Sequence, residues 1–417
     1  MLFRSYLAPT RALVNQLTRQ LRRDFAPLGI QVEQVSPALD LDRFEMNLLG
    51  EQSPHLRFRV LVTTPEKLDL LLRRDWEAKI GRPLTLVVVD EAHNLQSPGR
   101  GLKLELLLST INKECEKAQF LLLTPFIKNA REVARWLGGR NSGDISLSVD
   151  WQPNDRLVGI AELVAEPKPI GRGYNYQLEL QSVHTSRCTI AIEKPLVMLR
   201  SSDHPQSYSQ VSDVGTIAAL MARSLSHRGP VIVMHSTPAW VWGLAQKLVD
   251  NSSASQKLSP NVRLVCDYVK LELGADFPLV NCLRHGIGVH HAGLPDDIRV
   301  LMEWLFEEQE IKYLAATTTI AQGVNFPVSA VIMASNQYPS RTGSKPMPPE
   351  DFWNIAGRAG RVGHGELGVV ALAAENADKA EQYRAFINQN VGDLNSELIA
   401  LALEARDMME DLKGIVF

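Results

Sequence analysis

The sequence predicts an α/β protein in which two units, each built on a parallel sheet, are joined by a connecting segment. Short and almost wholly apolar runs such as residues 84–89 (LTLVVV) are typical of buried parallel strands. Stretches with a helical period of apolar residues alternate with these runs, as in β-α-β units. This alternation stops near residue 144 and resumes near residue 210, which indicates two units.

In the first unit, Leu13, Leu17 and Leu21 recur at a helical period between polar residues. Strands are expected at residues 2–7, 59–63, 84–89 and 120–124. Helices are expected at residues 13–25, 66–73 and 129–137, the last one ended by Gly138 and Gly139. We therefore predict a first domain over residues 1–143.

Residues 144–209 are richer in proline and glycine and predict a connecting segment with short strands at residues 189–192 and 196–199. The second domain is predicted over residues 210–375. Its expected helices are residues 214–226, 239–249 and 296–307, and its expected strands are residues 231–235, 313–316, 330–333 and 368–372. Residues 376–417 predict a helical C-terminal extension, with a helix-like stretch at residues 394–413.

Composition excludes several classes of protein. Hydrophobic residues make up 45% and charged residues 22% of the 417 residues, which is ordinary for a globular chain. The formal net charge of −3 argues against a polycationic coat for nucleic acid, although a cleft can carry its own potential. The four cysteines form no C-x-x-C pair, so neither a zinc site nor a disulfide framework is indicated. No apolar run is long enough to span a membrane, and we expect a cytoplasmic protein.

The tetrapeptide Asp90-Glu91-Ala92-His93 directly follows the apolar strand at residues 84–89. Ligands of α/β sheets bind at the carboxyl ends of strands. One carboxylate there can hold Mg²⁺ on nucleotide phosphates, and a second can orient the attacking water. The alternative is that Asp90 caps a helix and its neighbours are surface residues.

The segment Gly357-Arg358-Ala359-Gly360-Arg361 follows an expected helix at residues 350–356. Two arginines three apart on one helical face, with glycines allowing close approach, suit contact with phosphate. A solvated basic helix end is the alternative.

Hydroxyl-bearing residues follow three other strands. Thr317 begins a run of three threonines after the strand at residues 313–316 and offers donors to phosphate, or forms an ordinary turn. Thr64 and Pro65 have the form of a helix cap, and so does the segment Pro9-Thr10-Arg11. A helix N-terminus can also bind a backbone phosphate. For the adjacent His290 and His291, turn or backbone-contact roles are favoured over metal binding because neighbouring side chains diverge.

The order of these segments resembles superfamily 2 helicases. The segments PTRAL, TTPEKLD, VVVDEAH, LLLTP, VIVMHST, GVHHAGL, ATTTIAQGVNFP and IAGRAGR follow one another as in that superfamily. GVHHAGL, TTTIAQGVNFP and AGRAGR resemble in particular the superkiller-type DExH group of DEAD/DEAH-box helicases. The resemblance covers nearly the whole chain.

This resemblance implies two RecA-like domains that clamp ATP between them and grip one nucleic-acid strand. Asp90 would then hold Mg²⁺, Glu91 would polarise the attacking water, and His93 would link nucleotide state to strand grip. Arg358 and Arg361, flanked by Gly357 and Gly360, would act as arginine fingers, and Gly323 and Asn325 would couple the second domain to the nucleotide. The residues implied near the strand's backbone are Thr10, Arg11, Thr64, Pro65, His235, Ser236 and Thr317.

Two departures from the family pattern stand out. The third motif of the family is Ser-Ala-Thr, whereas this chain has Leu122-Leu123-Thr124, so that only the coupling residue Thr124 keeps a hydroxyl. The phosphate-binding loop G-x-x-x-x-G-K-[ST] does not occur in the sequence. We expect the first domain to lack the strand that feeds this loop, which would leave a gap or unpaired strand groups.

Two functions remain open on this basis. The first is an ATP-dependent DNA or RNA helicase, present as an incomplete or split copy whose phosphate-binding loop a separate chain could supply. The second is a catalytically inactive, nucleic-acid-binding or scaffold remnant of such a helicase.

Overall fold

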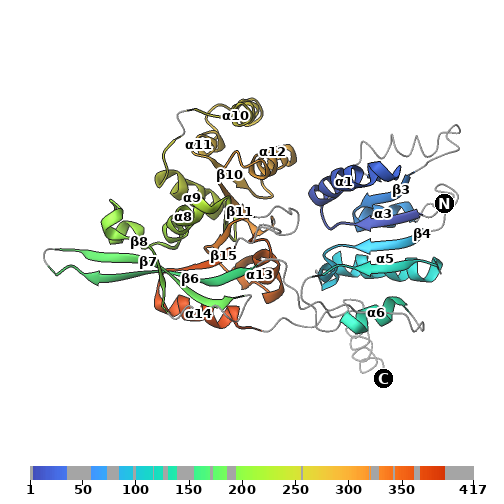
Figure 1. The fold of residues 1–417 in the computed structure, drawn as a ribbon, viewed down its shortest axis with the longest axis horizontal. Coiled ribbons are helices and arrows are strands. Elements are labelled where there is room, and N and C mark those ends of the chain that lie inside the picture. Colours follow the sequence, from blue (N-terminus) through green and yellow to red (C-terminus); the bar gives the residue numbers. More distant parts are fainter. Residues whose placement is uncertain are drawn as a thin grey trace, which may run out of the picture. The chain divides into compact units, whose positions relative to one another are not determined.

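The structure is a computed structural model that describes residues 3–34, 58–72, 84–96, 100–115, 117–124, 130–138, 155–169, 172–185, 194–254, 257–318, 320, 328–340, 343–360 and 367–389. These residues belong to two compact units, one within residues 1–148 and the other within residues 149–390. Figure 1 draws both as ribbons. Within the described residues, no helix has both the length and the apolarity needed to cross a membrane.

The first unit contains a parallel sheet in the order β2-β3-β1-β4-β5. Its strands are β1 (Phe3–Leu7), β2 (Gln31–Gln34), β3 (Phe58–Thr63), β4 (Leu84–Val89) and β5 (Gln119–Leu122). Its helices are α1 (Arg11–Phe25), α3 (Pro65–Leu72), α5 (Arg100–Glu114) and α6 (Ala130–Gly138). The described strands pair continuously, so the gap expected from the sequence is not found. Strand β5 is the last described strand on one side of this sheet and pairs only with β4 among the described strands.

Helices cover both faces of this sheet because the side chains of each strand alternate. Along β3, Val60 and Val62 pack against residues of α1, whereas Leu61 packs with residues of α3, α5 and α6. The N-terminus of α1 is capped by Thr10, whose hydroxyl oxygen accepts the Leu13 N–H at 3.3 Å. The predicted α/β class with a parallel sheet is therefore confirmed for this unit.

The second unit is built on a larger sheet in the order β10-β11-β9-β12-β15-β6-β7-β8. Its strands are β6 (Arg156–Pro167), β7 (Tyr174–Thr185), β8 (Leu196–Arg200), β9 (Val231–His235), β10 (Ile287–His290), β11 (Tyr313–Thr317), β12 (Ala330–Met333) and β15 (Gly368–Ala374). A separate hairpin pairs β13 (Gln337–Ser340) with β14 (Gly343–Pro346).

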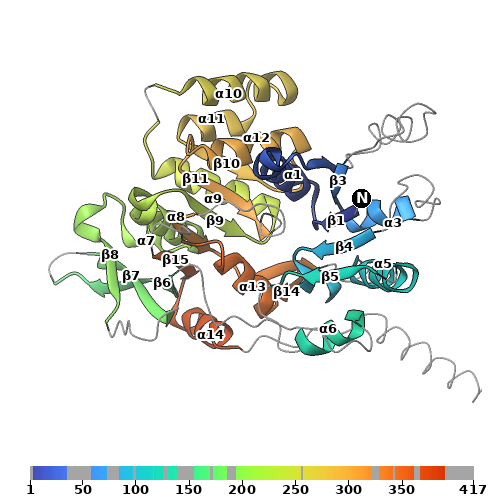
Figure 2. The same ribbon diagram turned by 45° about the vertical axis from the view of Figure 1, so that its right-hand side comes forward.

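The helices of the second unit are α7 (Tyr208–Val211), α8 (Val214–Leu225), α9 (Pro238–Asp250), α10 (Pro260–Leu273), α11 (Pro278–Arg284), α12 (Asp296–Glu307), α13 (Pro349–Ala356) and α14 (Ala377–Ile387). Helices α10, α11 and α12 gather at the β10 end of the sheet in both ribbon views (Figure 1, Figure 2). One continuous core joins the sheet to these helices.

The described strands within residues 144–209 belong to the second sheet, whereas the sequence predicts a separate connecting segment. Strand β6 pairs in parallel with β15, and β7 and β8 follow it in antiparallel pairing. Residues 156–161 of β6 are all buried, as in a strand that has neighbours on both sides. The described strands of this stretch therefore extend the second sheet. The strand expected at residues 189–192 and the helix expected at residues 394–413 lie outside the described residues.

Candidate nucleotide and nucleic-acid site

In the first unit, the predicted site residues gather at the carboxyl edge of the sheet. Leu7 lies beside both Thr63 and Val89 in the register, so the loops after β1, β3 and β4 leave the sheet together. The backbone ladder continues past the strand ends. The N–H of Asp90 donates to the Leu7 carbonyl at 2.9 Å, and the N–H of Leu123 donates to the Val89 carbonyl at 2.8 Å. The parallel register thereby brings together the loops that carry Thr10, Thr64, Asp90, Glu91 and Thr124.

The carboxylate of Asp90 is held by two donors. The Tyr6 hydroxyl donates to Oδ2 at 3.3 Å, and the backbone N–H of Glu91 donates to Oδ1 at 2.9 Å. Burial, followed by the charge of Asp90, raises the pKa of Tyr6 well above its ordinary value. The phenol therefore stays protonated and remains a donor. These contacts orient a carboxylate at the strand end, with oxygen atoms of the kind that Mg²⁺ prefers.

Glu91 has an unusual backbone conformation. Its φ of 52° lies in the left-handed region, which costs a non-glycine residue about 1–3 kcal/mol. Asn94 compensates by donating both its backbone N–H and its side-chain amide to the Glu91 carbonyl, each at 2.9 Å. The chain consequently turns sharply after β4 and enters the 3-10 helix Ala92–Gln96. The backbone of His93 lies in that helix, and its side chain is outside the described residues.

A contact between Ala92 and Leu123, the residue directly after β5, links this turn to the third motif. The N–H of Ala92, which is buried, donates to the Leu123 carbonyl at 2.9 Å. Leu123 directly precedes Thr124. A displacement of the Asp90-Glu91 turn would therefore be transmitted to the loop that carries the Thr124 hydroxyl.

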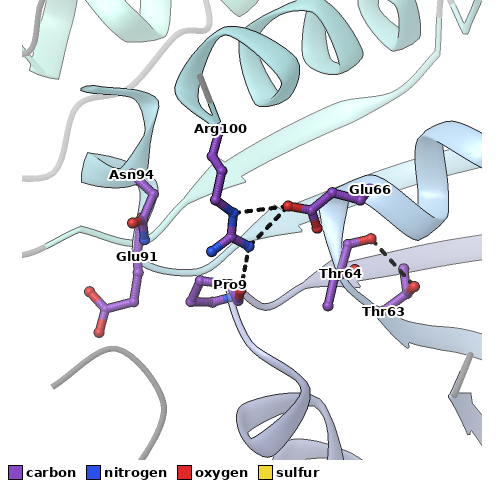
Figure 3. A network of polar contacts seen from close by, with 7 residues as sticks. All are labelled: Pro9, Thr63, Thr64, Glu66, Glu91, Asn94 and Arg100. Atoms are coloured by element: carbon purple, nitrogen blue, oxygen red, sulfur yellow. Dashed lines mark hydrogen bonds and ion pairs between the residues drawn. The ribbon is translucent and has the colours of Figure 1, made fainter. Parts of the chain in front are cut away.

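Arg100 joins the loop after β1 to the first turn of α3, as Figure 3 shows. From the start of α5, its guanidinium donates to the Pro9 carbonyl at 2.7 Å and to Glu66 Oε1 at 3.0 Å. Burial raises the pKa of Glu66, but the Glu66 backbone N–H, Arg100 and Thr64 together lower it below its ordinary value. No local pattern predicts the role of Arg100, because its partners lie far away along the chain.

The segments around Thr10 and Thr64 begin helices, as the sequence predicts. Helix α3 starts at Pro65, directly after Thr64. The Thr10 hydroxyl caps α1, and Arg11 begins that helix, although its side chain is outside the described residues. The cap that the sequence offered as an alternative is thus present at Thr10, while contact with a phosphate remains a prediction for both segments.

In the second unit, His235 and Thr317 lie side by side at the carboxyl ends of β9 and β11. The imidazole Nδ1 accepts the backbone N–H of Ser236 at 2.8 Å, so neutral His235 carries its proton on Nε2. Burial lowers the pKa of His235 to about 4, which keeps the ring neutral near pH 7. The hydroxyl of Ser236 lies 3.1 Å from the same Nδ1.

The described residues 357–360 form a turn, so Arg358 does not lie on the helical face that the sequence predicts. Helix α13 ends at Ala356, and Gly360 has a φ of 100°, which favours glycine. The turn is fixed by the Gly360 N–H, which donates to the Val328 carbonyl at 2.8 Å, and by the Val328 N–H, which donates to the Arg358 carbonyl at 3.3 Å.

The Arg358 turn also packs closely against β15. A Cβ at Gly368, the first residue of β15, would overlap the carbonyl group of Ala359. A Cβ at Gly357 would contact the guanidinium of the buried Arg156 at 3.7 Å. The remaining predicted residues of this part, Gly323, Asn325 and Arg361, lie outside the described residues.

The adjacent histidines contact other parts of the second unit. The Nε2 atom of His290 lies 2.8 Å from Glu303 on α12, and the Nδ1 atom of His291 accepts the Gly293 N–H at 3.0 Å. His291 therefore contacts the backbone of its own turn, the kind of role favoured from the sequence.

Comparison with known families identifies two domains in the chain. Residues 5–133 match the family described as DEAD/DEAH box helicase, and residues 246–363 match the helicase conserved C-terminal domain. The first match runs from within β1 into α6 and covers the first sheet, whereas the second runs from within α9 past the end of α13 and contains β10, β11 and β12 of the second sheet.

Three curated relatives match most of the chain. The ATP-dependent DNA helicase Hel308 of Methanocella arvoryzae is 27% identical over 94% of this chain and 48% of its own length. The Hachiman protein HamB of Bacillus cereus is 27% identical over 86% of this chain and 31% of its own length. The RQC trigger complex helicase SLH1 of Saccharomyces cerevisiae is 24% identical over 92% of this chain and 18% of its own length. The chain spans less than half the length of each of these relatives.

Proposed function

Because this chain belongs to the DExH-type helicases of superfamily 2, we propose that it couples ATP hydrolysis to translocation along, or unwinding of, nucleic acid. The observation that carries the proposal is the carboxyl edge of the first sheet. There the Asp90-Glu91 turn is hydrogen-bonded to the loop of Thr124. The turn follows β4, and the loop of Thr10 follows the neighbouring strand β1.

The roles proposed for the first unit follow from the chemistry of its side chains. Asp90 would hold Mg²⁺, since its carboxylate is already oriented by Tyr6 and by the Glu91 N–H. When bound, Mg²⁺ neutralises charge on the phosphates of ATP. Glu91 would polarise the attacking water, and His93 would relay the nucleotide state to the strand-binding loops.

In the second unit, Arg358 and Arg361 would contact the phosphates, with Gly357 and Gly360 giving the turn its shape. Gly323 and Asn325 would couple this unit to the nucleotide. Val328 follows the segment of Gly323 and Asn325 in the sequence. Its backbone N–H donates to the Arg358 turn and its carbonyl accepts from that turn, which supports the coupling.

Strand binding is proposed for Thr10, Arg11, Thr64 and Pro65 in the first unit and for His235, Ser236 and Thr317 in the second. Hydroxyls, backbone amides and the Nε2–H of neutral His235 are donors suited to phosphate oxygens. Contacts of this kind bind the backbone of DNA or RNA without reading its sequence.

We propose that a polypeptide outside these 417 residues, in the same or a separate chain, supplies the phosphate-binding loop. Strand β5 supports this idea because it ends the described sheet, while its Leu121 and the following Leu123 are 48% and 37% exposed. An apolar parallel strand added at β5 would cover these leucines and pair the free edge.

An inactive, strand-binding or scaffold protein is the second candidate. It is favoured by Leu122 and Leu123, which stand where the family has Ser and Ala before Thr124. Such a protein would bind strands without turnover.

Measurement of ATP hydrolysis with and without single-stranded DNA or RNA separates the two candidates. For the helicase, we expect strand-stimulated turnover that Glu91→Gln lowers by about 100-fold or more, as for loss of a group that assists proton transfer. Glu114→Gln, at an exposed site at the end of α5, should leave turnover unchanged. Strand binding without turnover, also after a polypeptide that carries the phosphate-binding loop is added, would exclude the helicase for this chain and support the second candidate.

A further inference from the structure

The indole of Trp240 is 61% exposed, although tryptophan is usually among the more buried residues. Trp240 lies in the first turn of α9, five residues after the last residue of β9. It is therefore close to the carboxyl edge of the second sheet, where His235, Ser236 and Thr317 also lie. No role in the proposed function has so far been given to it.

The indole of Trp240 has one ring stacked on it, while most of the residue remains exposed. The ring of His235 stacks on it with centroids 5.2 Å apart and planes 17° apart. Because His235 is itself held by the Ser236 N–H, the imidazole provides a fixed support for the indole. The large exposed fraction then belongs to the opposite face and the edges, and the described residues place no second ring on that face.

The surroundings favour a nucleic-acid strand as the occupant of the open face. Ser236 and the Nε2–H of His235 offer donors beside the indole, and the first turn of α9 contains no carboxylate that would repel phosphate. A rigid aromatic face next to donors for phosphate combines the two features by which proteins bind single strands. A purely apolar contact with another protein would not need these hydrogen-bond donors.

We propose that the open face of Trp240 stacks on a base of the bound single strand, next to the phosphate contacts of His235 and Ser236. The inference rests on the proposed strand binding and adds a base contact to it. Since every base has a flat aromatic face, this contact would strengthen binding without selecting a sequence.

Binding of the 417-residue chain to a fluorescent oligo(dT) of about 16 nucleotides, followed by anisotropy, tests the proposal. We expect Trp240→Ala to weaken binding by about 5- to 150-fold, and Trp240→Phe to weaken it much less. An abasic strand of the same length provides the second arm. The wild type should bind it more weakly than oligo(dT), whereas Trp240→Ala should discriminate between the two strands far less.

Tyr174→Ala provides a matched control. Tyr174 is also an exposed aromatic residue in contact with one neighbouring ring, but it lies on β7, separated from β9 by three strands. Its loss should leave binding unchanged. If Trp240→Ala binds oligo(dT) like the wild type, or loses affinity equally for the abasic strand, the stacking proposal is overturned while strand binding stands. If the wild type binds neither strand, the proposed strand binding fails as well.

Discussion

The carboxylates at the edge of the first sheet are positioned by residues that are themselves not part of any motif. Tyr6 lies in β1, yet its hydroxyl reaches Asp90 at the end of β4, because the two strands are neighbours. Asn94 likewise holds Glu91 in a conformation that few residues other than glycine adopt. Individual contacts thus determine the orientation of Asp90 and the backbone conformation of Glu91.

The pair Glu66–Arg100 gives a pH-dependent prediction. The pKa of Glu66 is lower in the folded chain than in the unfolded chain. The ionised carboxylate therefore stabilises the fold at any pH above its unfolded pKa of about 4.3, and this stabilisation is lost as the pH falls through its folded pKa. Both side chains are partly exposed, so we expect Glu66→Gln to cost about 0.2–1 kcal/mol at pH 7. Urea denaturation of both proteins checks this, and the difference should shrink below pH 4.3 or so. A difference that stays constant with pH would show that the charge of Glu66 is not responsible.

The Arg358 turn depends on the close approach of two elements. It lies against the start of β15, where only glycine leaves room for Ala359. The strand therefore acts as a support that sets the position of the arginine turn.

Replacement of Gly368 by Ala should disturb this turn. We expect the free energy of unfolding to fall by about 1–3 kcal/mol, since backbone must move to accommodate the methyl group. Hydrogen exchange of the Gly360 amide should become faster as its bond to Val328 weakens. Gly243→Ala, inside α9 with nothing within 4 Å of the added Cβ, is the control and should stabilise the chain by roughly 0.5–1 kcal/mol. Unchanged exchange at Gly360 in Gly368→Ala would contradict this account of the turn.

At the scale of the whole molecule, each unit has a hydrophobic core of its own. The core of the second unit extends from Leu157 on β6 to Ile387 on α14, and all described strands of its sheet belong to that unit. The first unit has its core on the two faces of its own sheet.

We therefore expect residues 149–390 to fold when expressed alone. Near-ultraviolet circular dichroism should show fixed aromatic packing, and thermal unfolding should be a single cooperative transition. A fragment that begins at residue 210, the predicted domain start, would lack β6, β7 and β8 and should be much less stable. Equal stability of the two fragments would show that these strands are dispensable.

Much of the secondary structure could be predicted because local signals were strong. The strands Val231–His235 and Ala330–Met333 and the helix Asp296–Glu307 have the predicted bounds. Strand β6 was missed because glycine and charged residues interrupt its apolar run and no helix separates it from β7. Its parallel partner, β15, lies about 200 residues later in the chain, and local patterns carry no information about such a pairing.

The sequence by itself determined the α/β class, the order of the motifs and the family, because apolar period and short motifs are properties of neighbouring residues. Only the tertiary structure decided that β6 completes the second sheet, that Arg100 joins the loops of Pro9 and Glu66, and that Arg358 lies in a turn against Gly368. It also showed that Trp240 stacks on His235 while most of the residue remains exposed. The physical reason is that these features depend on strand register and on contacts between segments distant in sequence, which form only when the sheets assemble.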